Sequence, residues 1–166
     1  MGYTNMLEIR KAVPSDYNDI WDIIRQVIAT GDTYVFAPDS SKEKMLAFWC
    51  GADKHTYVAL VDDKIAGTFF MKDNQPDLGA HIANAGYMTA PGIFGKGVGR
   101  AMGEFSITEA SRLGYNAMQF NIVVKSNERA VMLWKSLGFE IIGEIPDAFN
   151  HRQDGLTNAY IMYRKV

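Results

Sequence analysis

A glycine-rich segment constrains this chain more than any other sequence feature. Residues 95–99 are Gly-Lys-Gly-Val-Gly, and they stand between a stretch typical of a strand, 81–89, and one typical of a helix that ends near Leu113. Glycine lets the backbone turn sharply and approach a ligand closely. The amides of a helix's first turn lie at the positive end of its dipole and bind anions such as a pyrophosphate. The segment therefore predicts an anion site, with a plain glycine-rich turn as the alternative.

Two other phosphate-binding motifs fit the segment less well. A P-loop needs Ser or Thr after its Gly-Lys pair, whereas Gly97 follows Lys96 here. A dinucleotide-binding fingerprint needs an acidic residue about 20 positions further on, at the end of the next strand. The chain has Met-Gln-Phe-Asn at 118–121 instead, and it has too few alternating strand and helix units for a doubly wound sheet. These differences disfavour both a P-loop nucleotide site and a nicotinamide site.

The order of hydrophobic patterns predicts one α+β domain that spans residues 1–166. Apolar residues recur at helical spacing over about 15–29, and Ser40 with Glu43 forms a capping box for a second helix. Further helices follow the glycine segment and Asn127, which is expected to cap its helix. Strands are expected near 7–12 and over 56–61, 65–71, 81–89, 117–124, 139–145 and 157–164.

Composition excludes several classes of function. No apolar run approaches the roughly 20 residues that cross a bilayer, and the first ten residues do not resemble a secretory signal, so we expect a cytoplasmic protein without a membrane partner. The net charge of -2, without long runs of one sign, argues against a nucleic-acid partner. Cys50 is the sole cysteine and follows two aromatic residues, as a structural thiol would. The three histidines lack the spacing of a metal site.

A second motif lies about 30 residues after the glycine segment. Residues 127–134 are Asn-Glu-Arg-Ala-Val-Met-Leu-Trp, and Leu-Gly-Phe follows at 137–139. Together the two motifs resemble the GCN5-related N-acetyltransferase (GNAT) superfamily, whose signatures are Arg/Gln-x-x-Gly-x-Gly/Ala and Asn-x-x-Ala followed by Gly-Phe. The resemblance covers nearly the whole chain. It implies a mixed, splayed central sheet of about six to seven strands, flanked by about four helices, in an α+β fold.

The resemblance also implies the cofactor and its site. Acetyl-CoA would lie between the fourth and fifth strands, with its pyrophosphate on the amides of the glycine segment. The backbone of Met88 and Thr89 would pair with the pantetheine arm as with an added strand. The cofactor-binding residues implied in this way are Met88, Thr89, Phe94, Gly95, Lys96, Gly97, Val98, Gly99, Arg100, Asn127, Ala130 and Trp134.

The chain departs from the family pattern at two positions. Phe94 stands where the family usually has Arg or Gln, so one charged contact near the phosphates is lost. Trp134 stands where many members carry a tyrosine thought to protonate the leaving thiolate. An indole N–H is a donor only and does not deliver a proton at neutral pH. The proton for the leaving thiolate would therefore come from water or another group, or no general acid would take part.

The base and the acceptor site are less clearly marked. Some relatives use a glutamate on the fourth strand, and that position aligns with Ala83. His81 lies two residues away, hence on the same strand face, and is the candidate catalytic base, with a structural histidine as the alternative. The resemblance places Tyr34 and Phe36 at the acceptor site, where polar groups of Asn74, Asn84, Asn121 and His151 could join them.

These residues favour a particular kind of acceptor. No carboxylate-rich trough is present for a polycation, so we expect a primary amine of a small molecule or amino acid, as in the amino-acid and phosphinothricin N-acetyltransferase branch. Acetyl transfer to a hydroxyl or an arylamine would share every motif. A non-catalytic acyl-CoA sensor or interaction module on the same fold is the alternative. Many relatives dimerise, so a homodimer is possible.

Overall fold

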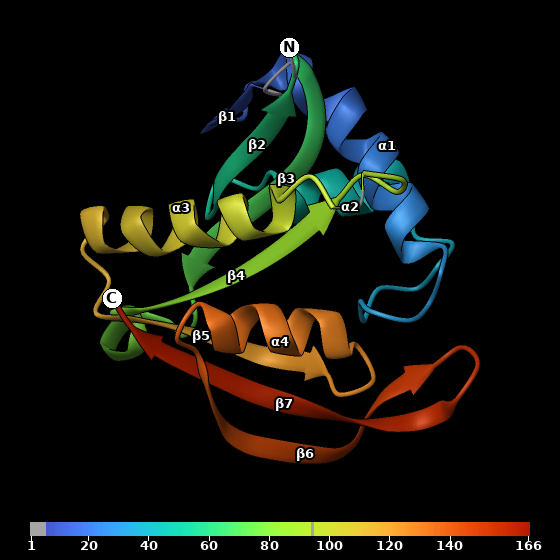
Figure 1. Ribbon diagram of the computed structural model, residues 1–166, viewed down its shortest axis with the longest axis vertical. Helices are drawn as coiled ribbons and strands as arrows, with labels where there is room; N and C mark the ends of the chain where they lie inside the picture. The colour runs from blue at the N-terminus through green and yellow to red at the C-terminus, as the bar shows by residue number, and fades with distance from the viewer. Residues whose placement is uncertain (1–5, 94) are drawn as a thin grey trace.

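The protein is described by a computed structural model, which covers residues 6–93 and 95–166. In this part of the chain a seven-stranded sheet has the order β1-β2-β3-β4-β5-β7-β6 (Figure 1). Every neighbouring pair is antiparallel except β4 and β5, which are parallel. The strands are β1 (Leu7–Lys11), β2 (His55–Val61), β3 (Lys64–Asp73), β4 (Ile82–Thr89), β5 (Ala117–Val124), β6 (Glu140–His151) and β7 (Gly155–Lys165). The α+β fold with a mixed sheet is therefore confirmed.

The parallel pair separates soon after it begins. Pairing between β4 and β5 is confined to Ile82 with Ala117 and Ala83 with Met118. One residue further along, the Asn84 side-chain amide donates to the Gln119 carbonyl at 3.0 Å. Figure 1 shows the two strands diverging toward their C-terminal ends. The splayed sheet is confirmed, and the divergence opens one edge of β4 to a ligand.

Within residues 6–93 and 95–166, four α-helices cover the two faces of the sheet. They are α1 (Tyr17–Ile28), α2 (Lys42–Trp49), α3 (Val98–Arg112) and α4 (Glu128–Ser136), with short 3-10 turns at Pro14–Asp16 and Asp77–Gly79. Helices α1 and α2 pack on one face, in a core that includes Ile24, Trp49 and Phe70. Helices α3 and α4 share the other core, around Met102 and Trp134. No helix in the described residues is long and apolar enough to cross a membrane.

A glycine brings α3 and α4 close together. A Cβ atom on Gly103 would lie 2.6 Å from Leu137 Cδ1 and 3.1 Å from a ring carbon of Trp134. Because real Cβ atoms do not approach other atoms so closely, a side chain here would force the Leu137 side chain to shift and would crowd the Trp134 ring. This contact fixes Trp134 against α3 and Tyr87.

Some predicted boundaries differ from the structure. Helix α2 is capped by Ser41, whose hydroxyl accepts from the Lys44 N–H at 3.1 Å, and not by Ser40. Both serines stand before an apolar run, so sequence spacing alone did not separate them. Strands β6 and β7 extend further than expected because their pairing continues to His151 and Gly155. The register of β6 is irregular, and Asp147 within it has φ of +51°. These irregularities interrupt the apolar–polar alternation, so the sequence pattern did not predict the rest of the strand.

Candidate active site

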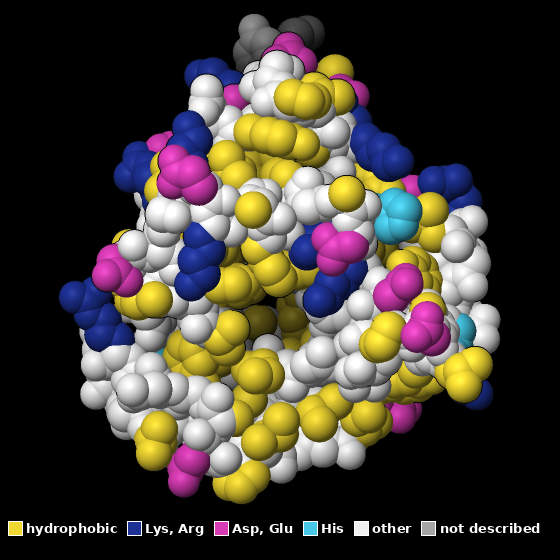
Figure 2. Space-filling model, turned by 180° about the vertical axis from the view of Figure 1, so that it is seen from behind, with side chains coloured by type: hydrophobic (Ala, Val, Ile, Leu, Met, Phe, Trp, Pro, Cys, Tyr) yellow, Lys and Arg dark blue, Asp and Glu magenta, His cyan; other side chains and the backbone are white. Residues whose placement is uncertain are grey.

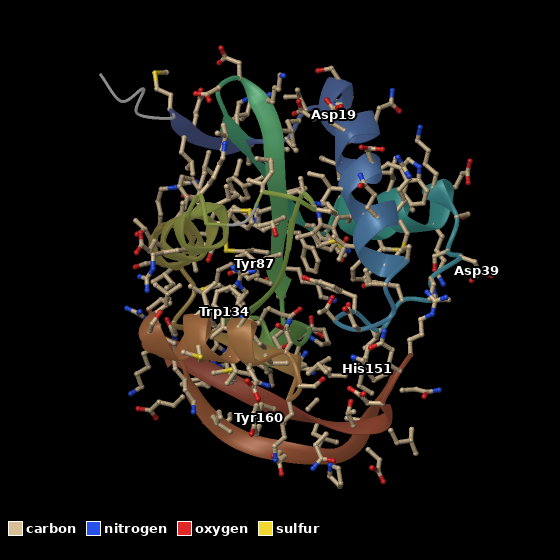
Figure 3. All side chains as sticks on the ribbon, turned by 45° about the vertical axis from the view of Figure 1, so that its right-hand side comes forward. Asp19, Asp39, Tyr87, Trp134, His151 and Tyr160 are labelled. Carbon is tan, nitrogen blue, oxygen red and sulfur yellow. The ribbon has the colours of Figure 1, made fainter. Side chains whose placement is uncertain are left out.

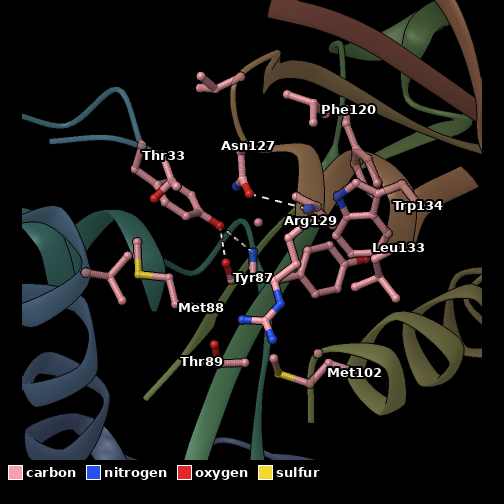
Figure 4. Close-up of a pocket in the computed structure, with 18 of the residues that line it drawn as sticks. Thr33, Tyr87, Met88, Thr89, Met102, Phe120, Asn127, Arg129, Leu133 and Trp134 are labelled. Atoms are coloured by element: carbon pink, nitrogen blue, oxygen red, sulfur yellow. Dashed lines mark hydrogen bonds between the residues drawn. The ribbon is translucent and has the colours of Figure 1, made fainter. Parts of the chain in front are cut away.

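A cavity of about 720 Å³ lies where β4 and β5 separate. Figure 2 shows the hollow near the middle of the molecule, with hydrophobic side chains along much of its rim. Its walls come from both halves of the sheet, from all four α-helices, from the loop after α1 and from the glycine loop. Figure 4 shows side chains that line this cavity. The cavity therefore coincides with the predicted cofactor cleft.

The glycine loop adopts a backbone shape that favours glycine. Gly95 has φ of +74° and Gly97 has φ of +71°, in the left-handed region that other residues avoid. A Cβ on either residue would meet no atom within 4 Å, so conformation and not crowding selects glycine here. Gly97 is the N-cap of α3, and the first helical hydrogen bond runs from Ala101 N–H to the Gly97 carbonyl.

The start of α3 fits an anion such as a pyrophosphate. The amides of Val98, Gly99 and Arg100 precede the first helical bond, and all three residues line the cavity. The first turn of α3 carries no acidic side chain that would repel an anion. Lys96 is exposed and does not line the cavity, whereas the prediction for Phe94 lies outside the described residues.

Two arginines are the only charged residues among the described residues that line the cavity. The Arg100 guanidinium donates to the Ser136 hydroxyl at 2.7 Å and pairs with Glu104 at 3.1 Å, so it is turned toward α4. Arg129 extends from the start of α4 across the cavity (Figure 4). Arg129 belongs to the motif at 127–134 but was not among the predicted site residues. Its position next to a predicted cofactor ligand, Asn127, was the available signal.

A tyrosine hydroxyl occupies the open edge of β4. Tyr34 accepts a hydrogen bond from the Tyr87 N–H at 2.7 Å and donates one to the Tyr87 carbonyl. Tyr87 therefore directs its backbone groups toward the cleft. Along an antiparallel ladder this direction alternates, so Ala85 and Thr89 also face the cleft and Met88 faces β3. Thr89 suits the predicted pairing with a pantetheine arm. Met88 also lines the cavity, but its backbone pairs with Thr68 of β3 and is not free to pair with a ligand.

Both tyrosine hydroxyls at this edge are held in their neutral form. Burial raises the pKa of Tyr34 and that of Tyr87 well above the ordinary range. The Tyr87 hydroxyl shares a hydrogen bond of 2.6 Å with Ser106, on the α3 side of the sheet. Each hydroxyl thus has a structural partner, and neither is placed to exchange a proton at neutral pH.

The far wall of the cavity is formed by α4 and β5. Trp134 is buried, with its ring 4.7 Å from those of Tyr87 and Phe120, and Figure 3 shows Tyr87 and Trp134 meeting from the two halves of the molecule. The Asn127 side chain accepts from the Ala130 N–H at 3.3 Å, as an N-cap does. Asn127, Ala130 and Trp134 all line the cavity, as expected of cofactor-binding residues.

The predicted acceptor and base residues are only partly brought together. Tyr34, Phe36, Asn84 and Asn121 line the cavity. Asn74 does not, although its side-chain oxygen accepts from Asn121 at 2.8 Å.

Neither predicted histidine lies in the cavity. His81 occupies an exposed turn before β4, whose cavity-lining part begins at Asn84. His151, at the end of β6 in Figure 3, accepts from the N–H groups of Gln153 and Asp154 and stabilises the hairpin turn. Period-two spacing assumed that His81 lies within the strand, whereas β4 begins one residue later, at Ile82. We therefore do not assign either histidine a role at the site.

Comparison with known proteins identifies the family. The model of the acetyltransferase (GNAT) family matches residues 21–139. The chain belongs to the GNAT family. A GCN5-related N-acetyltransferase structure from Kribbella flavida is 38% identical, with a TM-score of 0.91 over 96% of this chain and 98% of that one. A phosphinothricin acetyltransferase from Sinorhizobium meliloti, solved with AcCoA, is 21% identical with a TM-score of 0.85, over 99% and 89% of the two chains, and shares the fold.

A curated relative is similar over part of its length. N-acetyltransferase aca1 of Schizosaccharomyces pombe is 34% identical over 98 residues, which are 58% of this chain and 47% of that protein. The matched segment thus spans about half of the yeast protein.

The cavity of this GNAT-family chain has few side chains that could exchange a proton. None of the described residues that line it is Asp, Glu, His, Lys or Cys. Its tyrosines are engaged with Tyr87 backbone groups and with Ser106. The described part of the site therefore offers binding groups but no side chain that accepts a proton near neutral pH.

Proposed function

We propose that this GNAT protein transfers an acetyl group from acetyl-CoA to a primary amine of a small molecule or amino acid, by direct attack within a ternary complex. The observation that carries the proposal is the start of α3, where left-handed glycines and early helical amides face the cavity between the separated strands. Acetyl-CoA supplies the acetyl group as an activated thioester. The structures of relatives solved with this cofactor support the assignment.

Different residues of the chain bind different parts of acetyl-CoA. Amides of Val98, Gly99 and Arg100 hold the pyrophosphate by hydrogen bonds and helix dipole. The cleft-facing backbone of Thr89 pairs with the pantetheine arm. Trp134 covers the opposite side and excludes water from the reacting centre. Binding and orientation then supply most of the rate enhancement.

Proton transfer is left to water. An alkylammonium has a pKa of about 10.4, so only a small fraction of such an amine is neutral at pH 7. Since no described lining residue is a base near neutral pH, the amine loses its proton to solvent before or during binding. Trp134 supplies no proton, but a thiol of pKa about 8.5 is a fair leaving group without one.

Calorimetry and an activity assay together test the proposal. We would titrate acetyl-CoA into the protein, then follow release of free thiol with amino acids, alkylamines, polyamines and aminoglycosides. Binding with amine-dependent thiol release supports the proposal. Absence of binding by a folded sample refutes it.

A non-catalytic acyl-CoA sensor is the second candidate. The observation that favours it is the absence of an acid or base side chain among the described lining residues, together with Trp134 at the position of the family's tyrosine. Binding of acetyl-CoA without thiol release across the whole panel would support this candidate and refute the transferase.

A further inference from the structure

One end of the cavity is almost entirely apolar. It is formed by α1, α2, the loop between them and β3, and its side chains include Val27, Val35, Phe36, Phe48 and Phe70. The Phe36 and Phe48 rings lie 5.0 Å apart, and those of Phe48 and Phe70 lie 5.4 Å apart, all edge to face. Phe36 and Phe48 are half-buried and Val35 is 60% exposed, so this wall remains open to a ligand.

The same end offers no charge to a ligand. Among the described lining residues the charged ones are Arg100 and Arg129, on α3 and α4. The nearby Lys54 ammonium lies 4.3 Å from the Phe48 ring centre, pairs with Asp53 at 2.9 Å, and belongs to a side chain that is 4% exposed. It stabilises the outer side of the Phe48 ring and does not line the cavity.

The polar groups at this end are neutral and mostly engaged. The Tyr34 hydroxyl is bound to both backbone groups of Tyr87. On β5, Asn121 also lines the cavity; it donates to Asn74 and accepts from Gln119 at 3.1 Å. A charged group that packs against the Phe36 and Phe48 rings would lose part of its water without gaining a counter-charge from that wall, which is costly.

We infer that the acceptor is a small amine with an uncharged, apolar body, and that the wall formed by Val35, Phe36 and Phe48 holds that body. The inference rests on the proposed function and narrows its substrate class. Burial of an aliphatic or aromatic body against these side chains makes the free energy of binding more favourable. Partial desolvation disfavours an ammonium or carboxylate at the same point. Polyamines and acidic amines are therefore poor acceptors.

A matched series of acceptors tests the inference. Hexylamine, 1,5-diaminopentane and 6-aminohexanoate share an amine on five methylenes and end in a methyl, an ammonium and a carboxylate. We expect kcat/KM from thiol release to be higher for hexylamine by about tenfold or more, after correction for each amine's pKa. A preference for either charged acceptor overturns the inference and leaves the transferase intact. No turnover of any amine overturns both.

A charge introduced at Val35 tests where the apolar body of the acceptor lies within the cavity. Val35→Asp places a carboxylate on the exposed part of the wall, and Val35→Asn adds a neutral side chain of the same size. We expect Val35→Asp, but not Val35→Asn, to raise the ratio of kcat/KM for 1,5-diaminopentane over hexylamine by about tenfold, since a close opposite charge compensates the buried ammonium. An unchanged ratio in folded Val35→Asp, with circular dichroism as the check, would show that the body does not lie at this wall.

Discussion

The contact between Tyr34 and Tyr87 makes a stability prediction that depends on a single oxygen atom. Tyr34→Phe removes the hydroxyl that serves both the N–H and the carbonyl of Tyr87 and leaves the ring in place. The ladder of β4 directs these groups away from β3, and β5 has already diverged, so no strand replaces the lost partner. A buried polar group without a partner costs about 1–3 kcal/mol.

The expected loss of unfolding free energy lies near the lower limit of the range obtained by adding the costs of the two unpartnered Tyr87 groups. Because both groups border the cavity, water can reach them in part, and we expect Tyr34→Phe to lower the free energy of unfolding by about 2 kcal/mol. For a chain of this size, that loss lowers Tm by about 4–8 °C. Urea unfolding followed by circular dichroism measures the change, with the m-value expected to stay constant.

Tyr163→Phe is the matched control. No hydrogen bond joins the Tyr163 hydroxyl to any described residue, and its side chain is half-buried on β7. We expect its loss to change stability by no more than about 0.5 kcal/mol. If Tyr34→Phe were equally mild, the hydroxyl would not be holding β4, and the account of its open edge would be refuted.

Three further predictions address the cofactor site, the proton and acid stability. Gly97→Ala and Gly114→Ala each strain a left-handed residue with open space around it, so each should lower the free energy of unfolding by about 1–2 kcal/mol. Only Gly97→Ala should weaken acetyl-CoA binding in calorimetry, by about tenfold. Equal binding by both variants would contradict the role of the loop. If no lining residue is the base, kcat/KM should rise about tenfold per pH unit up to the acceptor's own pKa and shift with the acceptor; a break near pH 6–7 shared by all acceptors would reveal an enzyme base. Hydrogen bonds from Arg112 and then Tyr57 lower the pKa of Glu109 to about 2 from an ordinary 4.5, so its contribution to stability is present above pH 4.5 and is lost as the pH falls toward 2. Unfolding of Glu109→Gln should therefore depend less on pH over this range, and identical acid profiles would count against the pairing.

Much of the fold follows from local patterns. Alternation and helical spacing predicted the order of strands and helices because these periods reflect which side chains face a core. Gly97 and Asn127 were recognised because a left-handed N-cap and a side-chain cap are properties of a few neighbouring residues. For the same reason the glycine loop and the unbonded amides at the start of α3 were predictable from sequence.

The acceptor side depended on contacts between distant segments. His81 had a plausible residue type and spacing, yet β4 begins one residue later and the cavity begins only at Asn84. The hydroxyl of Tyr34 reaches Tyr87, 53 positions away, and no sequence period encodes that contact. Sequence by itself therefore determined the family, the fold and the glycine loop before α3, which local backbone chemistry specifies. Tertiary packing decided which groups meet in the cavity, because the divergence of β4 from β5 and the position of the loop after α1 arise only when the two halves of the sheet come together.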